Sequence, residues 1–368
     1  MPAPVMRTLG YVRSWITGRA DVRVRELVLD RDGTPIGATL VTPAAPSGPL
    51  PVWVVLHGVT RPGRTHRQLV RFTRALAESG AAVLVPEIPE WSVLDLAPQL
   101  TTPSVLAGLR ALERLGSGLV DAGRVGLLGF SFGAPQALVT SADAALRGRL
   151  AGVVGFGGYC DLERTLVFQF TGRHEWKGER YLLRPDPYGR WIVGANFLTS
   201  VPGYEDAGEV ARGLGRLATA AGDAGVVAWD PRFDADKEAI RATLAPGRRP
   251  LFDLFAPPSD RDPDGGPGEE MARLLAAASR RRQPTLEPGP FLRDIPCPVH
   301  LLHGRQDRLI PFSEMLRLAN ALPPGVLARS TVTRLFAHSS QDPLPGWRES
   351  VREATEFVKA LSGILGLV

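Results

Sequence analysis

Blocks of uninterrupted apolar residues alternate along the chain with segments of helical periodicity, first between residues 52 and 156 and again after residue 297. Continuous apolar blocks are typical of parallel strands that are buried on both faces, and amphipathic helices repeat apolar residues every three or four positions. The pattern therefore predicts an α/β protein with a doubly wound, mostly parallel sheet. The expected strands are 52–56, 81–85, 125–128, 151–156, 299–302 and 330–335, and the expected helices are 65–79, 102–115, 132–146, 312–321 and 347–361.

The first forty residues have a different pattern. Residues 7–17 have the periodicity of a short amphipathic helix, and residues 22–29 and 36–41 alternate apolar and polar side chains around Asp30-Arg31-Asp32-Gly33. Alternating segments on either side of a turn sequence predict an antiparallel hairpin. We expect this hairpin at an edge of the sheet.

The α/β alternation stops between Tyr159 and about Pro290. Helices are expected there at 161–170, 191–199, 205–221, 234–244 and 268–281, joined by segments rich in proline and glycine. We therefore divide the chain into a first part of the α/β core at 1–159, a helical cap or lid at 160–290, and a second part of the core at 291–368. Most aromatic residues of the cap are interpreted as the cap's own core, with some of them lining a pocket.

Composition and charge narrow the possible partners. The net charge of +5 comes from arginines scattered among acidic residues, so no nucleic-acid partner is expected. Two cysteines in 368 residues make no disulfide framework. The sequence has neither a secretory signal nor an apolar run of membrane length, which predicts a cytoplasmic protein without a membrane span. It has no metal-ligand spacing and no phosphate-binding motif, so no metal and no cofactor are expected.

The stretch Gly129-Phe130-Ser131-Phe132-Gly133 joins the expected strand 125–128 to a helix. A turn from strand to helix within one residue strains the backbone at the serine, and larger residues two positions away on either side would collide. The same turn lifts the serine hydroxyl out of the sheet to a helix N-terminus, where developing negative charge is stabilised. This context predicts that Ser131 is a nucleophile.

A serine nucleophile needs a base, and the base works better when an acid orients it. In an open α/β sheet such groups gather beyond the carboxyl ends of the strands. Asp307 follows the strand expected at 299–302, and His338 follows the last expected strand. The three residues occur in the order Ser131, Asp307, His338.

These motifs resemble the α/β-hydrolase family over roughly residues 22–159 and 291–368. The matching stretches are His57-Gly58, 129–133, 303–311 and His338. The resemblance implies that Ser131 attacks an acyl carbonyl, that His338 transfers the proton and that Asp307 orients the imidazolium. It also implies an oxyanion hole formed by the backbone N–H groups of Phe132 and Val59.

The same resemblance leaves an alternative acid, Asp161, since some family members carry the acid after the strand that follows the nucleophile. We favour Asp307 because the residues around it match the family motif. His57 is interpreted as structural, since the chemistry uses the backbone of its turn, and His303 is expected to pack or hydrogen-bond near the Asp307 loop.

The predicted function is that of a serine hydrolase that cleaves a carboxylic ester or thioester of a small molecule through an acyl-enzyme. An acyltransferase or amidase with the same triad remains an alternative, as does a non-catalytic ligand-binding member of the fold. The large cap favours a small substrate enclosed in a pocket.

Overall fold

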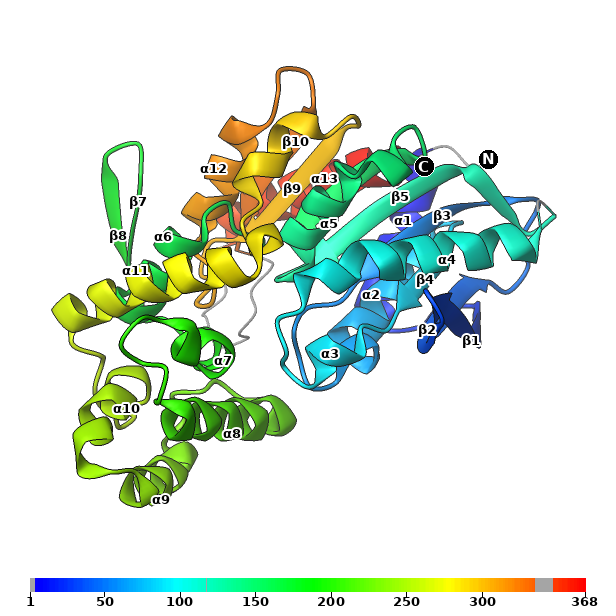
Figure 1. The fold of residues 1–368 in the computed structure, drawn as a ribbon. Helices are drawn as coiled ribbons and strands as arrows, with labels where there is room; N and C mark the ends of the chain where they lie inside the picture. The colour runs from blue at the N-terminus through cyan, green and yellow to red at the C-terminus, as the bar shows by residue number, and fades with distance from the viewer. Residues whose placement is uncertain (1–3, 117, 335–346) are drawn as a thin grey trace.

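The computed structural model describes residues 4–116, 118–334 and 347–368 of the chain. The prediction for His338 therefore lies outside the described residues. The structure has a central mixed sheet covered by helices, and a helical layer that extends beyond one end of the sheet (Figure 1).

The central sheet has eight strands, and their order confirms the doubly wound, mostly parallel architecture. The first two strands form the predicted antiparallel hairpin at one edge of the sheet. The second of them also pairs antiparallel with its other neighbour. The remaining neighbours pair in parallel. In sheet order the strands are β1 (Val22–Arg31), β2 (Thr34–Pro43), β4 (Ala82–Pro86), β3 (Leu50–Leu56), β5 (Val120–Phe130), β6 (Leu150–Phe156), β9 (Val299–Gly304) and β10 (Leu327–Thr333).

Helices cover both faces of the sheet because the central strands are apolar on both sides. Along β3, Trp53 and Val55 pack into the core under one face, whereas Val54 and Leu56 pack into the core under the other. Successive side chains of a strand point to opposite faces, which explains this division. The first core is covered by α1 (Pro4–Thr17), α2 (Arg67–Glu78) and α13 (Trp347–Leu365), and the second by α4 (Thr101–Leu115), α5 (Gly133–Ser141) and α12 (Phe312–Ala321). A four-residue helix, α3 (Pro89–Ser92), follows β4.

The inserted segment lies between β6 and β9, which are neighbours in the sheet. We call residues 160–290 the cap; these boundaries remain a prediction. Its helices are α6 (Leu162–Thr171), α7 (Tyr188–Phe197), α8 (Gly208–Ala224), α9 (Asp234–Thr243), α10 (Arg249–Phe255) and α11 (Gly265–Arg282). Phe170, Trp191, Phe252 and Phe255 are fully buried among them, so aromatic side chains do form much of the cap's core.

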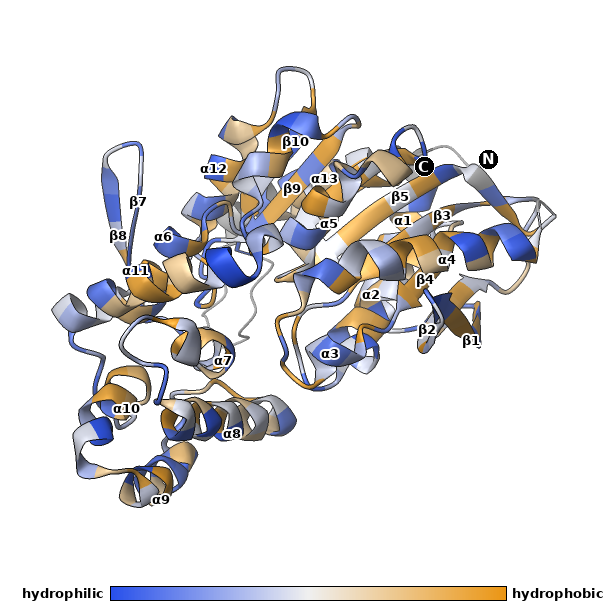
Figure 2. Cartoon of the chain, in the orientation of Figure 1, coloured by the Kyte–Doolittle hydropathy of each residue, from blue (hydrophilic) through white to orange (hydrophobic). Residues whose placement is uncertain are grey.

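The cap also contains two elements that the sequence did not predict. The helix α10 is one, and the other is a two-stranded hairpin of β7 (Arg173–Trp176) and β8 (Glu179–Leu182). The hairpin turns at Lys177 and Gly178, which both have positive φ, at 50° and 83°. A two-residue turn with both central residues at positive φ matches the twist of the strands that it joins. The hairpin is largely hydrophilic, unlike the central strands β5 and β9 (Figure 2).

Candidate active site

Ser131 occupies the turn between β5 and α5, in a backbone conformation that few side chains adopt. Its φ is 51°, and its N–H donates to the carbonyl of Phe156 on β6 at 2.8 Å. A Cβ on Gly129 would overlap the carbonyl oxygen of Gly133, and a Cβ on Gly133 would lie 2.6 Å from the carbonyl oxygen of His57. The glycines two residues before and after Ser131 are therefore required by close backbone approach, as the sequence motif predicts. This geometry is that of a nucleophile elbow.

The loop after β3 runs alongside this elbow. A Cβ on Gly58 would lie 3.3 Å from the Cβ of Ser131, so the loop approaches the serine closely. Val59 and Thr60, the next residues of the loop, line the same pocket as Ser131. Among the described residues, the backbone N–H groups of Val59 and Phe132 make no hydrogen bond of their own. These two N–H groups are the donors expected for the oxyanion hole, and that assignment remains a prediction.

His57 supports this loop through backbone contacts. Its Nδ1 lies 2.8 Å from the carbonyl oxygen of Gly58, and its Nε2 lies 3.1 Å from the backbone nitrogen of Ile88. The first nitrogen therefore donates and the second accepts, which assigns the neutral imidazole. Burial lowers the pKa of His57, in agreement with a neutral ring. The ring thus ties the loop to the end of β4, which is the structural role expected from the sequence.

Asp307 is buried in the turn that follows β9. Its Oδ1 accepts the backbone N–H groups of Leu309 at 2.9 Å and Ile310 at 3.0 Å. Its Oδ2 lies 3.2 Å from Nε2 of His303, which also lies 2.9 Å from the carbonyl oxygen of Ile310. His303 therefore does hydrogen-bond near this loop, as expected. These contacts fix the carboxylate at the carboxyl end of a central strand, the place that the predicted acid requires.

The alternative acid has a different role in the structure. Asp161 is the N-cap of α6, where its Oδ1 accepts the backbone N–H of Arg164 at 2.8 Å. Its Oδ2 lies 3.6 Å from the guanidinium of the same arginine. A carboxylate that caps a helix is stabilised there by the free N–H groups of the first turn. Capping of α6 therefore explains why an aspartate stands at position 161. It does not explain the buried aspartate at position 307, which caps no described helix of eight or more residues.

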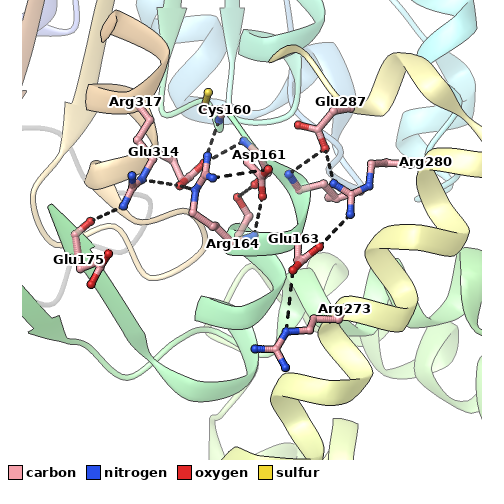
Figure 3. Close-up of polar contacts among 12 residues, drawn as sticks. Cys160, Asp161, Glu163, Arg164, Glu175, Arg273, Arg280, Glu287, Glu314 and Arg317 are labelled. Atoms are coloured by element: carbon pink, nitrogen blue, oxygen red, sulfur yellow. Dashed lines mark hydrogen bonds and ion pairs between the residues drawn. The ribbon is translucent and has the colours of Figure 1, made fainter. Parts of the chain in front are cut away.

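Buried carboxylates hold the junction between the cap and the core around Asp161 (Figure 3). Glu314 of α12 accepts the backbone N–H groups of Cys160 at 3.1 Å and Asp161 at 2.9 Å, and Nε of Arg164 donates to it at 2.9 Å. Burial raises the pKa of Glu314, and the positive charge of Arg164 opposes this effect. The carboxylate thus fixes the first residues of the cap to the core.

Glu287 makes a similar contact at the other end of the cap. It accepts the backbone N–H of Leu162 at 3.3 Å and lies 3.4 Å from the guanidinium of Arg280. Burial raises its pKa to about 7. The thiol of Cys160, next to these groups, has its pKa raised by burial to about 12, so it is not a reactive thiolate. Cys160 and Cys297 are both free.

Ser131 lines a cavity with a volume of about 140 Å³. The core loops form its floor, and α6, α7 and α11 of the cap form its roof. None of the lining residues, all of them within the described part of the chain, is charged. The lining residues are Val59, Thr60, Leu96, Ser131, Phe132, Tyr159, Leu162, Thr165, Leu166, Gln169, Tyr188, Gly189, Ile192, Val193, Phe197, Ser279, Leu286, Leu309 and Ile310.

The residues that line the roof were mostly missed from the sequence. Among the aromatic residues of the cap, Tyr188 and Phe197 line the pocket, whereas Phe168, Phe170 and Trp191 are buried in packing. On α6 the lining residues recur at 162, 165, 166 and 169, which is the spacing of one helix face. That spacing could have identified the face, although not what it covers.

The part of the chain that the structure describes contains no cluster of three or more histidine, cysteine or acidic side chains able to hold a metal ion. Across the same residues, no helix combines the length and the apolar character needed to cross a membrane.

Solved structures similar to this one are α/β-hydrolases. The acylaminoacyl peptidase of Pyrococcus horikoshii aligns with a TM-score of 0.53 and 11% identity over 95% of this chain and 42% of the peptidase. Brefeldin A esterase, a bacterial homologue of human hormone-sensitive lipase, aligns at 0.49 and 18% identity, over 99% of this chain and 86% of the esterase. Est1E from Butyrivibrio proteoclasticus aligns with a TM-score of 0.48 and 13% identity, over 92% of this chain and 97% of Est1E.

No protein-family model matches the sequence, and no curated protein matches it either. The chain spans less than half of the peptidase, so the likeness concerns the fold. The protein has the α/β-hydrolase fold, as the sequence motifs indicated.

Proposed function

We propose that the protein is a serine hydrolase that cleaves a carboxylic ester or thioester of a small, largely apolar molecule. The observation that carries this proposal is the setting of Ser131. The residue lies in a strained turn at the end of a central strand, and it lines a pocket under the cap whose described residues are uncharged. Strained backbone at the wall of a pocket is typical of catalytic residues. The fold, shared with known esterases and peptidases, supports the same class of reaction.

In the proposed reaction, Oγ of Ser131 bonds to the acyl carbon while its proton passes to His338. The N–H groups of Phe132 and Val59 stabilise the oxyanion of the tetrahedral intermediate. Collapse of the intermediate breaks the bond to the leaving alcohol or thiol, which takes the proton from His338. Water then attacks the acyl-serine, with His338 again as the base, and the carboxylic acid leaves. Asp307 orients and charge-balances the imidazolium throughout.

The test is active-site labelling with a fluorophosphonate probe together with turnover of aryl esters of short and medium chain length. The wild type is expected to be labelled and to hydrolyse part of the panel, and Ser131→Ala is expected to lose both. Ser141→Ala is the matched control. Ser141 is the last residue of α5, the helix that follows Ser131, and it is buried. Its Oγ donates to the carbonyl of Leu138 at 2.8 Å, and the residue does not line the pocket. A folded wild type that is neither labelled nor active would favour a ligand-binding protein.

A further inference from the structure

Polar atoms without partners occur in the otherwise apolar pocket. Within the described part of the chain, four lining residues carry a buried side-chain oxygen with no hydrogen bond: Thr60, Gln169, Tyr188 and Ser279. A buried polar group without a partner is destabilising, and native proteins rarely retain one. Where such a group lines a pocket, a bound ligand can supply the missing partner.

The position and the orientation of Gln169 can both be read from its contacts. It is 5% exposed and lies in the last turn of α6. Its side-chain amide lies against Gly189 of α7, where a Cβ would stand 2.7 Å from the Cδ of Gln169. A larger residue at position 189 would therefore force this amide to move.

The orientation of the amide follows from its one hydrogen bond. Nε2 donates to the backbone carbonyl of Leu309 at 3.2 Å. The reversed amide would bring two oxygen atoms together, so the nitrogen faces Leu309 and Oε1 is the atom left without a partner. An amide oxygen can only accept a hydrogen bond. The complementary ligand group must therefore be a donor, such as a hydroxyl or an amide N–H.

Gln169 also lies near the proposed chemistry. Leu309, the residue that it contacts, donates its own backbone N–H to Asp307 at 2.9 Å. The hydroxyl of Thr165, on the same face of α6, is already satisfied because it donates to the carbonyl of Asp161 at 2.8 Å. Among the lining residues of this α6 face, Gln169 is thus the one whose side chain carries a polar atom without a partner.

We propose, on the basis of the serine hydrolase function above, that the substrate is a neutral, apolar ester whose acyl chain carries a hydroxyl or amide N–H group, and that Oε1 of Gln169 accepts a hydrogen bond from it. The lining residues that the structure describes are uncharged, so they offer a substrate no partner for an ion pair. A site built to hydrogen-bond a substrate group discriminates against the analogue without that group, because the buried partner is then left unpaired.

The test compares p-nitrophenyl esters of medium-chain ω-hydroxy acids with their methyl-terminated isosteres. In the wild type, kcat/KM for the hydroxy ester is expected to exceed that of its isostere by about tenfold at the chain length that reaches Gln169. Gln169→Met keeps the size of the side chain and removes the acceptor, so it should abolish or reverse this preference.

Gln136→Met is the matched control. Gln136 is fully buried, its Nε2 donates to the carbonyl of Thr285 at 3.0 Å and its Oε1 also has no partner, but it does not line the pocket. This variant should keep the preference for the hydroxy ester. Comparison of Gln169→Met with Gln136→Met therefore separates recognition of the substrate hydroxyl from a general effect on stability. Absence of any preference in the wild type, or an equal preference in Gln169→Met, would overturn the inference.

Labelling by the fluorophosphonate probe separates these outcomes from failure of the proposed function. An enzyme that is labelled but shows no preference remains a serine hydrolase without this recognition. A folded enzyme that is neither labelled nor active would overturn the proposed function and this inference together.

Discussion

Oδ2 of Asp307 lies 3.2 Å from Nε2 of His303, and both side chains are sealed from solvent. The histidine comes from the end of β9 and the aspartate from the turn that follows it, so the strand itself fixes one side of the carboxylate. The backbone N–H groups of Leu309 and Ile310 fix the other oxygen. A carboxylate held in this way can orient a catalytic base without moving itself.

We therefore predict that Asp307→Asn lowers kcat/KM for an aryl ester by roughly 10³–10⁴-fold, since the neutral amide no longer stabilises the imidazolium of the base. Asp161→Asn should keep most of the activity, because asparagine is also a good N-cap for α6. Steady-state kinetics of both variants decide the assignment. If Asp161→Asn alone were inactive while both variants remained folded, Asp161 would be the acid.

The strained backbone at Ser131 predicts an unusual order of stability. With φ at 51°, a Cβ at this position is unfavourable, so Ser131→Gly should be about 1 kcal/mol more stable than Ser131→Ala. Both variants lack the proposed nucleophile and should be inactive. Urea denaturation followed by circular dichroism measures the difference.

The corresponding glycine and alanine variants of Ser141 provide the control. Ser141 ends the regular helix α5, where glycine is less favourable than alanine, so Ser141→Gly should be the less stable variant there. If Ser131→Ala and Ser131→Gly were equally stable, the turn would not be strained in solution.

Glu287 predicts a pH dependence of stability. The pKa of its carboxyl is raised to about 7 by burial, from about 4.5 in an unfolded chain. Because the folded state holds the proton more tightly, the contribution of this group to stability is fully present below pH 4.5 and is lost as the pH rises through 7. Glu287→Gln removes the ionisation, so relative to the wild type it should gain stability between these pH values.

The gain should be on the order of 1 kcal/mol at pH 8, since solvent and Arg280 screen part of the effect. Thermal denaturation at several pH values measures it, with the exposed Glu238→Gln as the control. A constant difference in melting temperature between wild type and Glu287→Gln from pH 5 to pH 8 would contradict the prediction.

The sheet was predictable from the sequence because its strands carry a local signal. The run from Val52 to Leu56 is apolar at every position, and burial on both faces is the physical cause of that pattern. The positions of Gly129 and Gly133 were equally predictable, since a Cβ at either position would clash with the closely approaching backbone of the turn. The predicted acid and oxyanion donors also fall next to strand ends, where the fold brings residues together.

The cap was predicted less completely because its contacts link residues that lie far apart in the sequence. The hairpin of β7 and β8 is short, charged and half exposed, so no apolar alternation marks it. The contact between Gln169 and Leu309 joins α6 to a loop 140 residues later. No local sequence pattern indicates such a contact. The residues that line the pocket could therefore not be predicted before the fold was known.

β6 and β9 pair directly with each other, from Val153↔Val299 to Phe156↔Leu302, although the whole cap separates them along the chain. The continuity of the sheet at this point therefore depends on no residue of the cap. A substitution in the roof of the pocket can therefore change the shape of the pocket while the turn at Ser131 keeps its hydrogen bond to Phe156 of β6.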